Sequence, residues 1–371
     1  MSIELWTLAI ALVTSVVCAL CGSLLLVNRQ AMVSEGLSHA VLPGLVIAFI
    51  LLRDYNSPWL IISAAASGLL MVWLTQLLQN TRLLDNDAGL GIVFAGMFSV
   101  GILIVSSNLR NTHFHADCII DGNLALAPLD RWTWAGVDLG PRSWNSMLVM
   151  LFVVVGFITL CFKELKVMFF DPLLAGQFRL RPRSLQFVWL AIVSLTTVAA
   201  FEVAGSILIV ALMIAPPAAA YLLTDRLSRL LVIAAVIAAI SATGGFYLAV
   251  ALDVAPTGPI ASFAGAVFLT VFAFAPRRGW LAVSLRRSRQ RRETADCLVL
   301  DLLSRHRPQT DSWEDFLATV CMPVRQVERT LQRLQQSTYI QPTDSGYELT
   351  PHGREQLQTK LTHLLAGGDI S

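Results

Sequence analysis

The chain has 371 residues, of which 55% are hydrophobic and 14% are charged, and its formal net charge is +2. This composition is too apolar for an ordinary soluble domain of this length. The six cysteines are scattered, so they give no disulfide framework. Cys18 and Cys21 form a C-x-x-C inside an apolar stretch, where packing explains them more simply than metal or redox chemistry.

The apolar residues fall into long blocks that predict membrane-spanning helices. Most blocks reach the roughly 20 residues that a helix needs to cross a bilayer. The sequence therefore predicts an all-α polytopic membrane protein with eight or nine spans. The count depends on the seventh apolar run, which follows FEVAG and fits either a span or a broken, re-entrant segment. The blocks are Leu5–Val27, Ala31–Leu52, Trp59–Gln79, Ala88–Leu109, Ser146–Cys161, Leu185–Phe201, Val203–Thr224 (the run after FEVAG), Leu230–Leu252 and Val254–Pro276.

Basic residues in the predicted loops give the orientation of the chain. When nine blocks alternate across the membrane, one set of loops contains sixteen arginines and lysines and the other contains four. Because basic residues collect in cytoplasmic loops, the richer set is predicted to be cytoplasmic. This set includes the segment after the last block, so we expect a multi-pass protein with a cytoplasmic C-terminus.

Residues 28–44, NRQAMVSEGLSHAVLPG, place ionisable groups next to and inside an apolar block. An ionisable side chain at membrane depth is costly, so such groups usually face a protein interior or a water-filled path. Glu35 and His39 are four residues apart and share one face of a helix. A carboxylate and an imidazole can bind a divalent metal ion transiently. A buried hydrogen-bonded pair that fixes helix packing is the alternative, and counting along the block puts Glu35 near the cytoplasmic end.

The predicted outer loop, HFHADCIIDGNLALAPLD, concentrates side chains that ligate metals. Such a loop is able to receive a metal ion from a donor protein, since histidine and carboxylate suit several transition metals. A solvated polar loop without a ligand explains the same composition. The candidate ligands are His113, His115 and Asp117, with Cys118 and Asp121 beside them.

The stretch FFDPLLAGQFRL lies between two basic clusters on the predicted cytoplasmic side. It is short and amphipathic, so it fits a helix that docks in a groove of a soluble partner. An interfacial helix that rests on the membrane is the alternative. The apolar anchors are Phe169, Phe170, Leu173, Leu174 and Phe178.

After Arg292 the composition changes to that of a soluble domain. Residues 293–371 contain seven basic and eleven acidic residues. The run RRSRQRR before them is most simply an anchor against anionic lipid. The pattern of the tail predicts helices at Thr294–Ser304, Ser312–Val320 and Val324–Gln336, followed by a hairpin of Tyr339–Ile340 and Tyr347–Leu349.

The motif NRQAMVSEGLSHAVLPG resembles the signature of membrane subunits of bacterial ABC importers for zinc, manganese and ferrous iron, with Gly36 at a usual alanine position. Further matches follow in the family's order over about residues 5–280. They are DNDAGLGIVFAGMFSVGILIVS, HFHADCIIDGNLALAPLD, FFDPLLAGQFRL, EVAGSILIVALMIAPPAAAYLL and DVAPTGPIASF. The resemblance implies that Glu35 and His39 contact the ion on its pathway. It also implies that the ATPase is contacted by Phe169, Phe170, Asp171, Pro172, Leu174 and Phe178.

This resemblance implies a subunit that carries Mn²⁺, Zn²⁺ or Fe²⁺ into the cytoplasm and binds no permanent cofactor. Its implied partners are cytoplasmic ABC ATPase subunits, a periplasmic or lipid-anchored metal-binding protein and a second permease subunit in the bacterial inner membrane. The sequence has no G-x-x-x-x-G-K-[ST], so ATP hydrolysis is expected in a separate chain. Carboxylate and imidazole ligands do not select among the three metals.

The tail, closed by GYELTPHG, resembles the winged helix of diphtheria-toxin-repressor-type regulators, with Val324–Gln336 as recognition helix. Arg325, Arg329 and Arg333 recur at every fourth position, which suits contact with DNA phosphates. The acidic charge of the tail opposes such contact, so regulation or protein binding is favoured over nucleic acid. We expect a transmembrane permease domain over residues 1–280, a basic linker over 281–293 and a winged-helix domain over 294–371.

Two other functions fit parts of the sequence. The first is a membrane-anchored metal-responsive transcription regulator, in which the helices sense and the tail reads DNA. The second is a membrane enzyme that uses Glu35 and His39 as acid and base. No third catalytic group stands at a motif-like spacing, and H-E-x-x-H and G-x-S-x-G are both absent from the sequence. The order of the transporter motifs favours the importer over both.

Overall fold

A computed structural model describes most of the chain, namely residues 3–53, 58–81, 86–108, 124–134, 137–170, 182–276, 278–305, 324–343 and 346–365. The chain divides into two compact units, Met1–Gly279 and Trp280–Ser371, called here the membrane unit and the C-terminal unit. Each unit has an apolar core of its own.

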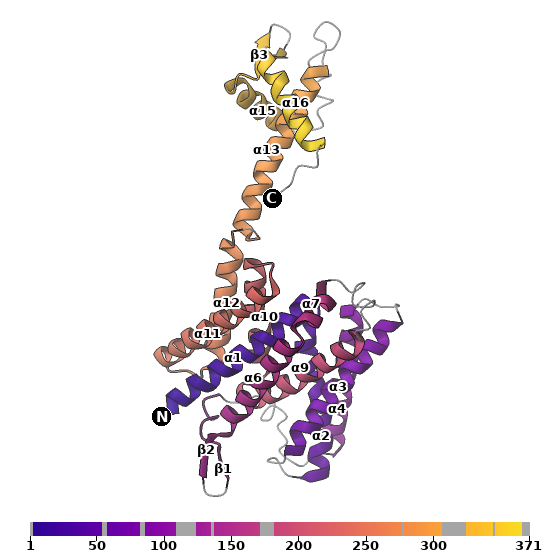
Figure 1. Cartoon of the computed structure of the whole chain (residues 1–371), viewed down its shortest axis with the longest axis vertical. Coiled ribbons are helices and arrows are strands. Elements are labelled where there is room, and N and C mark those ends of the chain that lie inside the picture. The colour runs from indigo at the N-terminus through magenta and orange to yellow at the C-terminus, as the bar shows by residue number, and fades with distance from the viewer. Residues whose placement is uncertain are drawn as a thin grey trace. The chain divides into compact units, whose positions relative to one another are not determined.

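Nine helices in the described part of the membrane unit are long and apolar enough to cross a membrane. This confirms the prediction of a mostly helical, multi-pass membrane protein and places the number of candidate spans at nine. Figure 1 shows these helices side by side in one body. They are α1 (Ile3–Val27), α2 (Met32–Leu52), α3 (Pro58–Asn80), α4 (Asn86–Asn108), α6 (Arg142–Leu160), α9 (Pro182–Ala204), α10 (Ser206–Leu223), α11 (Leu227–Leu252) and α12 (Thr257–Phe274).

The long apolar run around FEVAG forms two helices, α9 and α10, which meet at Gly205. Gly205 has a φ of 77°, a backbone conformation that glycine adopts without steric cost. Its N–H donates a hydrogen bond of 2.9 Å to the carbonyl of Phe201, which closes the last turn of α9. The run therefore forms two separate candidate spans, and α10 continues through Pro216 and Pro217.

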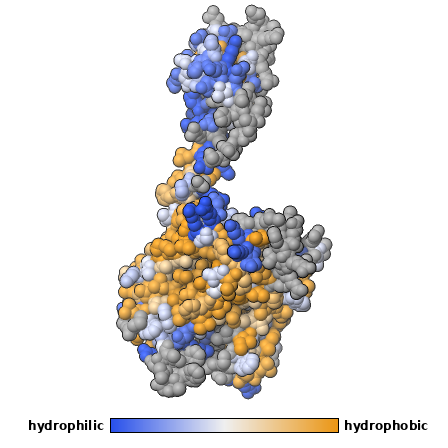
Figure 2. Space-filling model, viewed as in Figure 1, coloured by the Kyte–Doolittle hydropathy of each residue, from blue (hydrophilic) through white to orange (hydrophobic). Residues whose placement is uncertain are grey.

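Helix α1 forms the centre of the membrane unit. It packs against α6, α9, α10 and α11, and its side chains are mostly buried. The approach to α10 is close, because a Cβ atom at Gly22 would overlap the backbone carbonyl of Met213. By contrast, α12 buries only Ile260 and Ala264 among its described side chains. Figure 2 shows that the visible surface of the membrane unit is largely hydrophobic, as contact with lipid requires.

A short hairpin in the membrane unit was missed by the sequence analysis. Strands β1 (Arg131–Trp134) and β2 (Val137–Pro141) pair antiparallel and lead into α6. Trp6 of α1 lies edge-on to Trp144 of α6, with ring centroids 5.8 Å apart. The hairpin and the N-terminal end of α1 therefore lie at the same end of the membrane unit (Figure 1). A search for apolar blocks does not detect strands of four or five residues.

The C-terminal unit contains three described helices and one hairpin. Its core consists of apolar side chains from α13, α15, the first strand and α16, including Leu300, Leu331, Ile340 and Leu357. Ile340 pairs with Leu349, and Thr343 pairs with Gly346. The elements are α13 (Trp280–Arg305), α15 (Val324–Gln336), β3 (Ile340–Thr343), β4 (Gly346–Leu349) and α16 (Pro351–Leu365).

The structure and the sequence patterns of this unit agree in part. Helix α15 has the bounds predicted for the recognition helix, and the hairpin lies where it was expected. Residues 281–293, expected as a linker, form the first half of α13, which continues through Thr294–Ser304. Helix α16 was not predicted. The helix expected at Ser312–Val320 lies outside the described residues.

The close approach of α1 and α10 gives a stability prediction. We expect Gly22→Ala to destabilise the membrane unit by about 1–3 kcal/mol, since the added methyl group forces apart two packed backbones. Gly156→Ala is the matched control, because a Cβ atom at Gly156 meets no atom within 4 Å. Thermal unfolding of the purified chain in detergent, followed by size-exclusion chromatography, measures both variants. Equal melting temperatures for the two variants would contradict the packing argument.

Candidate functional site

The polar motif of residues 28–44 forms the turn between α1 and α2 and the first half of α2. Helix α1 ends at Val27, and Arg29 adopts a positive φ of 57° in the turn. Ser34 Oγ donates a hydrogen bond of 2.9 Å to the carbonyl of Ala31, close to the start of α2. Helix α2 begins at Met32, so Glu35 lies in its first turn, and the helix continues through Pro43 to Leu52. A carboxylate there is also favoured by the helix dipole.

Glu35 and His39 lie on the same side of α2, as their spacing predicts. Glu35 is exposed and His39 is half-buried, whereas Leu37 and Ala40 between and beside them are fully buried. The His39 ring stacks on Phe94 of α4 at a centroid distance of 5.7 Å and meets the edge of Phe98 at 5.2 Å. Two aromatic side chains from a neighbouring helix therefore fix the plane of the imidazole. The sequence analysis did not identify these two phenylalanines.

Neither Glu35 nor His39 makes a hydrogen bond or ion pair through its side chain within the residues that the structure describes. Over the same residues there is no group of three or more histidine, cysteine, aspartate or glutamate side chains close enough to hold a metal ion. Among the described residues, α2 therefore carries one carboxylate and one imidazole that no other side chain engages by a hydrogen bond or ion pair.

A cavity of about 960 Å³ lies farther along α2 than Glu35 and His39, and its lining is mostly apolar. It is lined by residues of α2, α3 and α4, including Gly44, Ser67 and Met97. It contains no ionisable side chain and neither Glu35 nor His39. The cavity is apolar, so it is not a candidate metal site.

The other predicted metal ligands lie outside the described residues. These are His113, His115 and Asp117, with Cys118 and Asp121. The described residues that flank this loop bring three charged groups together. The backbone carbonyl of Asp130 accepts a hydrogen bond of 2.9 Å from the backbone N–H of Arg142 at the start of α6. The carboxyl group of Glu202 in α9 interacts electrostatically with the side chains of Arg142 and Asp130. These charges mark the end of the membrane unit that contains the hairpin.

The predicted ATPase contact begins at the end of α7 (Phe162–Phe170), a short helix that follows α6. Leu165 is buried against the core, whereas Lys163 and Lys166 are exposed, so α7 is amphipathic. Phe169 and Phe170 are its last two residues. Asp171, Pro172, Leu174 and Phe178 lie outside the described residues.

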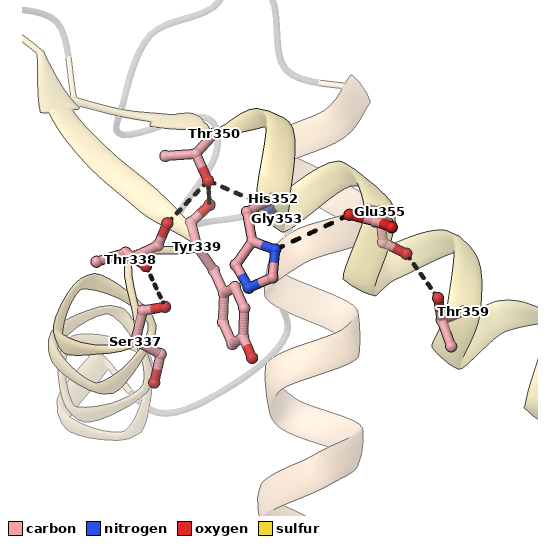
Figure 3. A network of polar contacts seen from close by, with 8 residues as sticks. All are labelled: Ser337, Thr338, Tyr339, Thr350, His352, Gly353, Glu355 and Thr359. Atoms are coloured by element: carbon pink, nitrogen blue, oxygen red, sulfur yellow. Dashed lines mark hydrogen bonds and ion pairs between the residues drawn. The ribbon is translucent and has the colours of Figure 1, made fainter.

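In the C-terminal unit, the sequence T-P-H-G joins the hairpin to α16 through a compact polar network (Figure 3). Thr350 Oγ1 donates to the carbonyls of Thr338 and Tyr339 at 2.8 and 3.1 Å, and it accepts the Gly353 N–H at 3.1 Å. Thr350 is therefore the N-cap of α16, and Pro351 occupies the first helical position, where its missing N–H is tolerated. A Cβ atom at Gly353 would overlap the Tyr339 carbonyl, so glycine permits the close approach.

Three arginines were expected on one face of α15, and Arg333 is the one with polar contacts among the described side chains. Arg333 forms an ion pair of 3.1 Å with Asp296 of α13. Arg329 is exposed, and the side chain of Arg325 is outside the described set. The face that was expected to contact DNA is thus partly turned toward α13.

The comparisons with known proteins identify the family of the membrane unit. Residues 2–275 match the ABC 3 transport family. The chain belongs to the ABC 3 transport family. This confirms the family predicted from the motifs between residues 5 and 280, and it accounts for nearly the whole membrane unit.

Several similar proteins are named as membrane proteins of metal transport systems. The manganese transport system membrane protein MntD of Bacillus subtilis is 36% identical over 295 residues, which are 80% of this chain and all of that protein. The zinc transport system membrane protein TroD of Treponema pallidum is 39% identical over 270 residues, 73% of each chain. The chelated iron transport system membrane protein YfeC of Yersinia pestis is 34% identical over 76% of this chain and 90% of its own.

A solved structure supports the fold. PsaBC from Streptococcus pneumoniae in complex with Fab matches with a TM-score of 0.60 and 24% identity, over 75% of this chain and 94% of that chain. The fold of the membrane unit is therefore similar to that of the matched chain. The C-terminal unit lies beyond the family match, which ends at residue 275.

The Thr350 network predicts the stability of the hairpin. Thr350→Val removes an N-cap and should destabilise the start of α16 by about 1 kcal/mol. Hydrogen–deuterium exchange of the full chain should then show faster exchange in β3, β4 and the first turn of α16. Thr359→Val is the control, since Thr359 Oγ1 bonds only to the Glu355 carbonyl of its own helix. The network has no such role if the two variants exchange alike.

Proposed function

We propose that this chain is the membrane permease of an ATP-driven ABC importer that moves Mn²⁺, Zn²⁺ or Fe²⁺ into the cytoplasm. The observation that carries the proposal is the Glu35–His39 pair on an outward face of α2. In a family whose relatives belong to manganese, zinc and iron transport systems, this pair offers oxygen and nitrogen ligands suited to all three ions. The ion is the substrate, and the chain holds no permanent cofactor.

The small number of ligands suits transport. A closed four-ligand site holds its metal firmly, whereas a pathway must release the ion after binding it. Glu35 and His39 provide two ligands, and water or the same pair from a second permease subunit, identical or paralogous, completes the coordination. Phe94 and Phe98 hold the imidazole plane in place, so His39 needs little reordering when the ion arrives. Two subunits facing each other would also cover the exposed Glu35.

Other subunits supply energy and substrate. The chain lacks a P-loop motif, so cytoplasmic ABC ATPase subunits hydrolyse ATP. The amphipathic α7 leads into the docking stretch of Phe169, Phe170, Asp171, Pro172, Leu174 and Phe178. On the opposite side of the bacterial inner membrane, a periplasmic or lipid-anchored binding protein delivers the ion to the loop with His113, His115 and Asp117.

The proposed domain organisation is a permease domain over residues 1–280, a basic segment over 281–293 and a cytoplasmic winged-helix domain over 294–371. The order of α15, β3 and β4 and the capped start of α16 support a winged helix. The Arg333–Asp296 ion pair occupies part of the face that DNA would need. We therefore assign the domain to regulation or protein contact, with DNA reading by a membrane-anchored regulator as the alternative.

The first test concerns the metal ligands. Glu35→Ala and His39→Ala should each reduce uptake of radioactive Mn²⁺, Zn²⁺ or Fe²⁺ by at least about tenfold, because each removes one of two ligands. Uptake is measured in cells that express the chain with its ATPase and binding protein. Glu355→Ala and His352→Ala, exposed residues of the same types in the C-terminal unit, are the controls. Assembly of the complex is checked by co-purification, and normal uptake by both α2 variants would refute the site.

The second test concerns coupling to the ATPase. Changing Phe170 and Leu174 together to Asp should prevent co-purification of the ATPase and abolish transport, since a charge replaces each apolar anchor. Leu126→Asp with Leu129→Asp is the matched control, as both leucines are exposed on the segment before the hairpin. An ATPase that still co-purifies with the Phe170/Leu174 variant and responds to loaded binding protein would show that the docking assignment is wrong.

A further inference from the structure

Four arginines surround a cavity in the C-terminal unit that the transport function does not use. The cavity has a volume of about 450 Å³ and lies between α13 and α15. Arg291 and Arg292 line it from α13, and Arg329 and Arg333 line it from α15, together with Gln332 and Gln336. The residues come from segments far apart in the sequence, so folding of this unit alone assembles the cluster.

One of the four guanidinium groups is held in a fixed position. Arg333 donates to Asp296 at 3.1 Å and to Thr330 Oγ1 at 3.2 Å. Thr330 is fully buried, and the Asp296 side chain is 20% exposed, so both partners are themselves held by the core. The remaining N–H groups of Arg333 stay available to a ligand. The arrangement is therefore preorganised on the α15 side.

The positive charges of the other three guanidinium groups are not balanced by an acidic partner among the described residues. Arg291, Arg292 and Arg329 are exposed, and none forms an ion pair in the portion of the chain that the structure covers. Asp296 thus offsets one of four positive charges at the cavity. Residues 280–371 contain twelve basic and eleven acidic residues, so the positive charge is local and does not reflect a generally basic domain. Like charges gathered around a concave surface attract an anion.

The chemistry of the lining specifies the kind of anion. Arginine presents a planar fork of donors that matches phosphate oxygens, and glutamine amides add neutral donors. The volume lies within the usual range of small-ligand pockets. Duplex DNA is read by an element that projects into a groove, whereas these arginines converge on a hollow between two helices. A compact ligand with several negative charges fits better than an extended one.

We propose that the cavity between α13 and α15 binds a compact, multiply charged phosphate group. The group belongs either to a free metabolite, such as a nucleotide or pyrophosphate, or to the headgroup of an anionic lipid. Binding would link α13, which follows directly on the membrane unit in the chain, to α15. The site is independent of the proposed metal pathway, so it can be tested without transport.

The test uses the full chain in nanodiscs of phosphatidylcholine and measures pyrophosphate binding by isothermal titration calorimetry. Arg291→Gln with Arg329→Gln should weaken the Kd by about tenfold or more, because two charge-assisted contacts are lost. Both side chains are exposed, so the fold should tolerate the change. Arg286→Gln with Arg354→Gln is the matched control, since it removes the same charge from exposed positions outside the cavity and should change the Kd by less than roughly twofold.

Two further arms identify the source of the phosphate. A weaker apparent Kd for pyrophosphate in nanodiscs that contain phosphatidylglycerol would show that a lipid headgroup occupies the site, and an unchanged Kd would indicate a free phosphate. The proposal is overturned if the native chain binds no pyrophosphate, or if both double variants bind it equally. It is also overturned if duplex DNA binds more tightly than pyrophosphate with the same dependence on Arg291 and Arg329, because the surface would then be a nucleic-acid interface.

Discussion

A lipid bilayer offers no hydrogen bonds, so the membrane unit must satisfy its polar groups internally, and the rest of its structure depends on this constraint. Several of its hydroxyl side chains bond back to their own helices, whereas the buried hydroxyls of Thr14, Ser15 and Thr75 have no partner among the described residues. Ser23, Thr197 and Ser241 donate to the carbonyls of Ala19, Val193 and Ile237 at 2.6 to 2.8 Å. Between helices, Ser67 of α3 donates to the Ala40 carbonyl of α2 at 2.6 Å. These four hydroxyl groups are therefore satisfied by backbone carbonyls.

Glu35 and His39 stand out against that background. Both are ionisable, and both lie on a face of α2 that the described chain leaves partly open. Such a face tolerates these groups if it meets water or a second subunit, which is the situation of a shared ion pathway. The position of Glu35 in the first turn of α2 places the pair toward the end of the helix that follows the α1–α2 turn. The proposed ligands therefore lie near one end of α2.

The C-terminal unit differs from the membrane unit in that it exposes many charged side chains. Their arrangement therefore decides which ligands the unit attracts. Thr350 caps α16 and fixes the hairpin, and Asp296 fixes Arg333. The same ion pair orients one wall of the arginine cavity that is proposed to bind an anion.

The sequence by itself determined the class of the protein, the candidate spans, the shared face of Glu35 and His39, and the family. These features depend on local quantities: the length of an apolar run, the 3.6-residue period of a helix and the order of motifs along the chain. The bounds of α15 were predictable for the same reason. Only the tertiary structure brought Phe94 and Phe98 to His39, joined Asp296 to Arg333 and formed the β1–β2 hairpin. Each of these depends on packing between segments that are distant in sequence or too short to show a period, and no local pattern encodes such contacts.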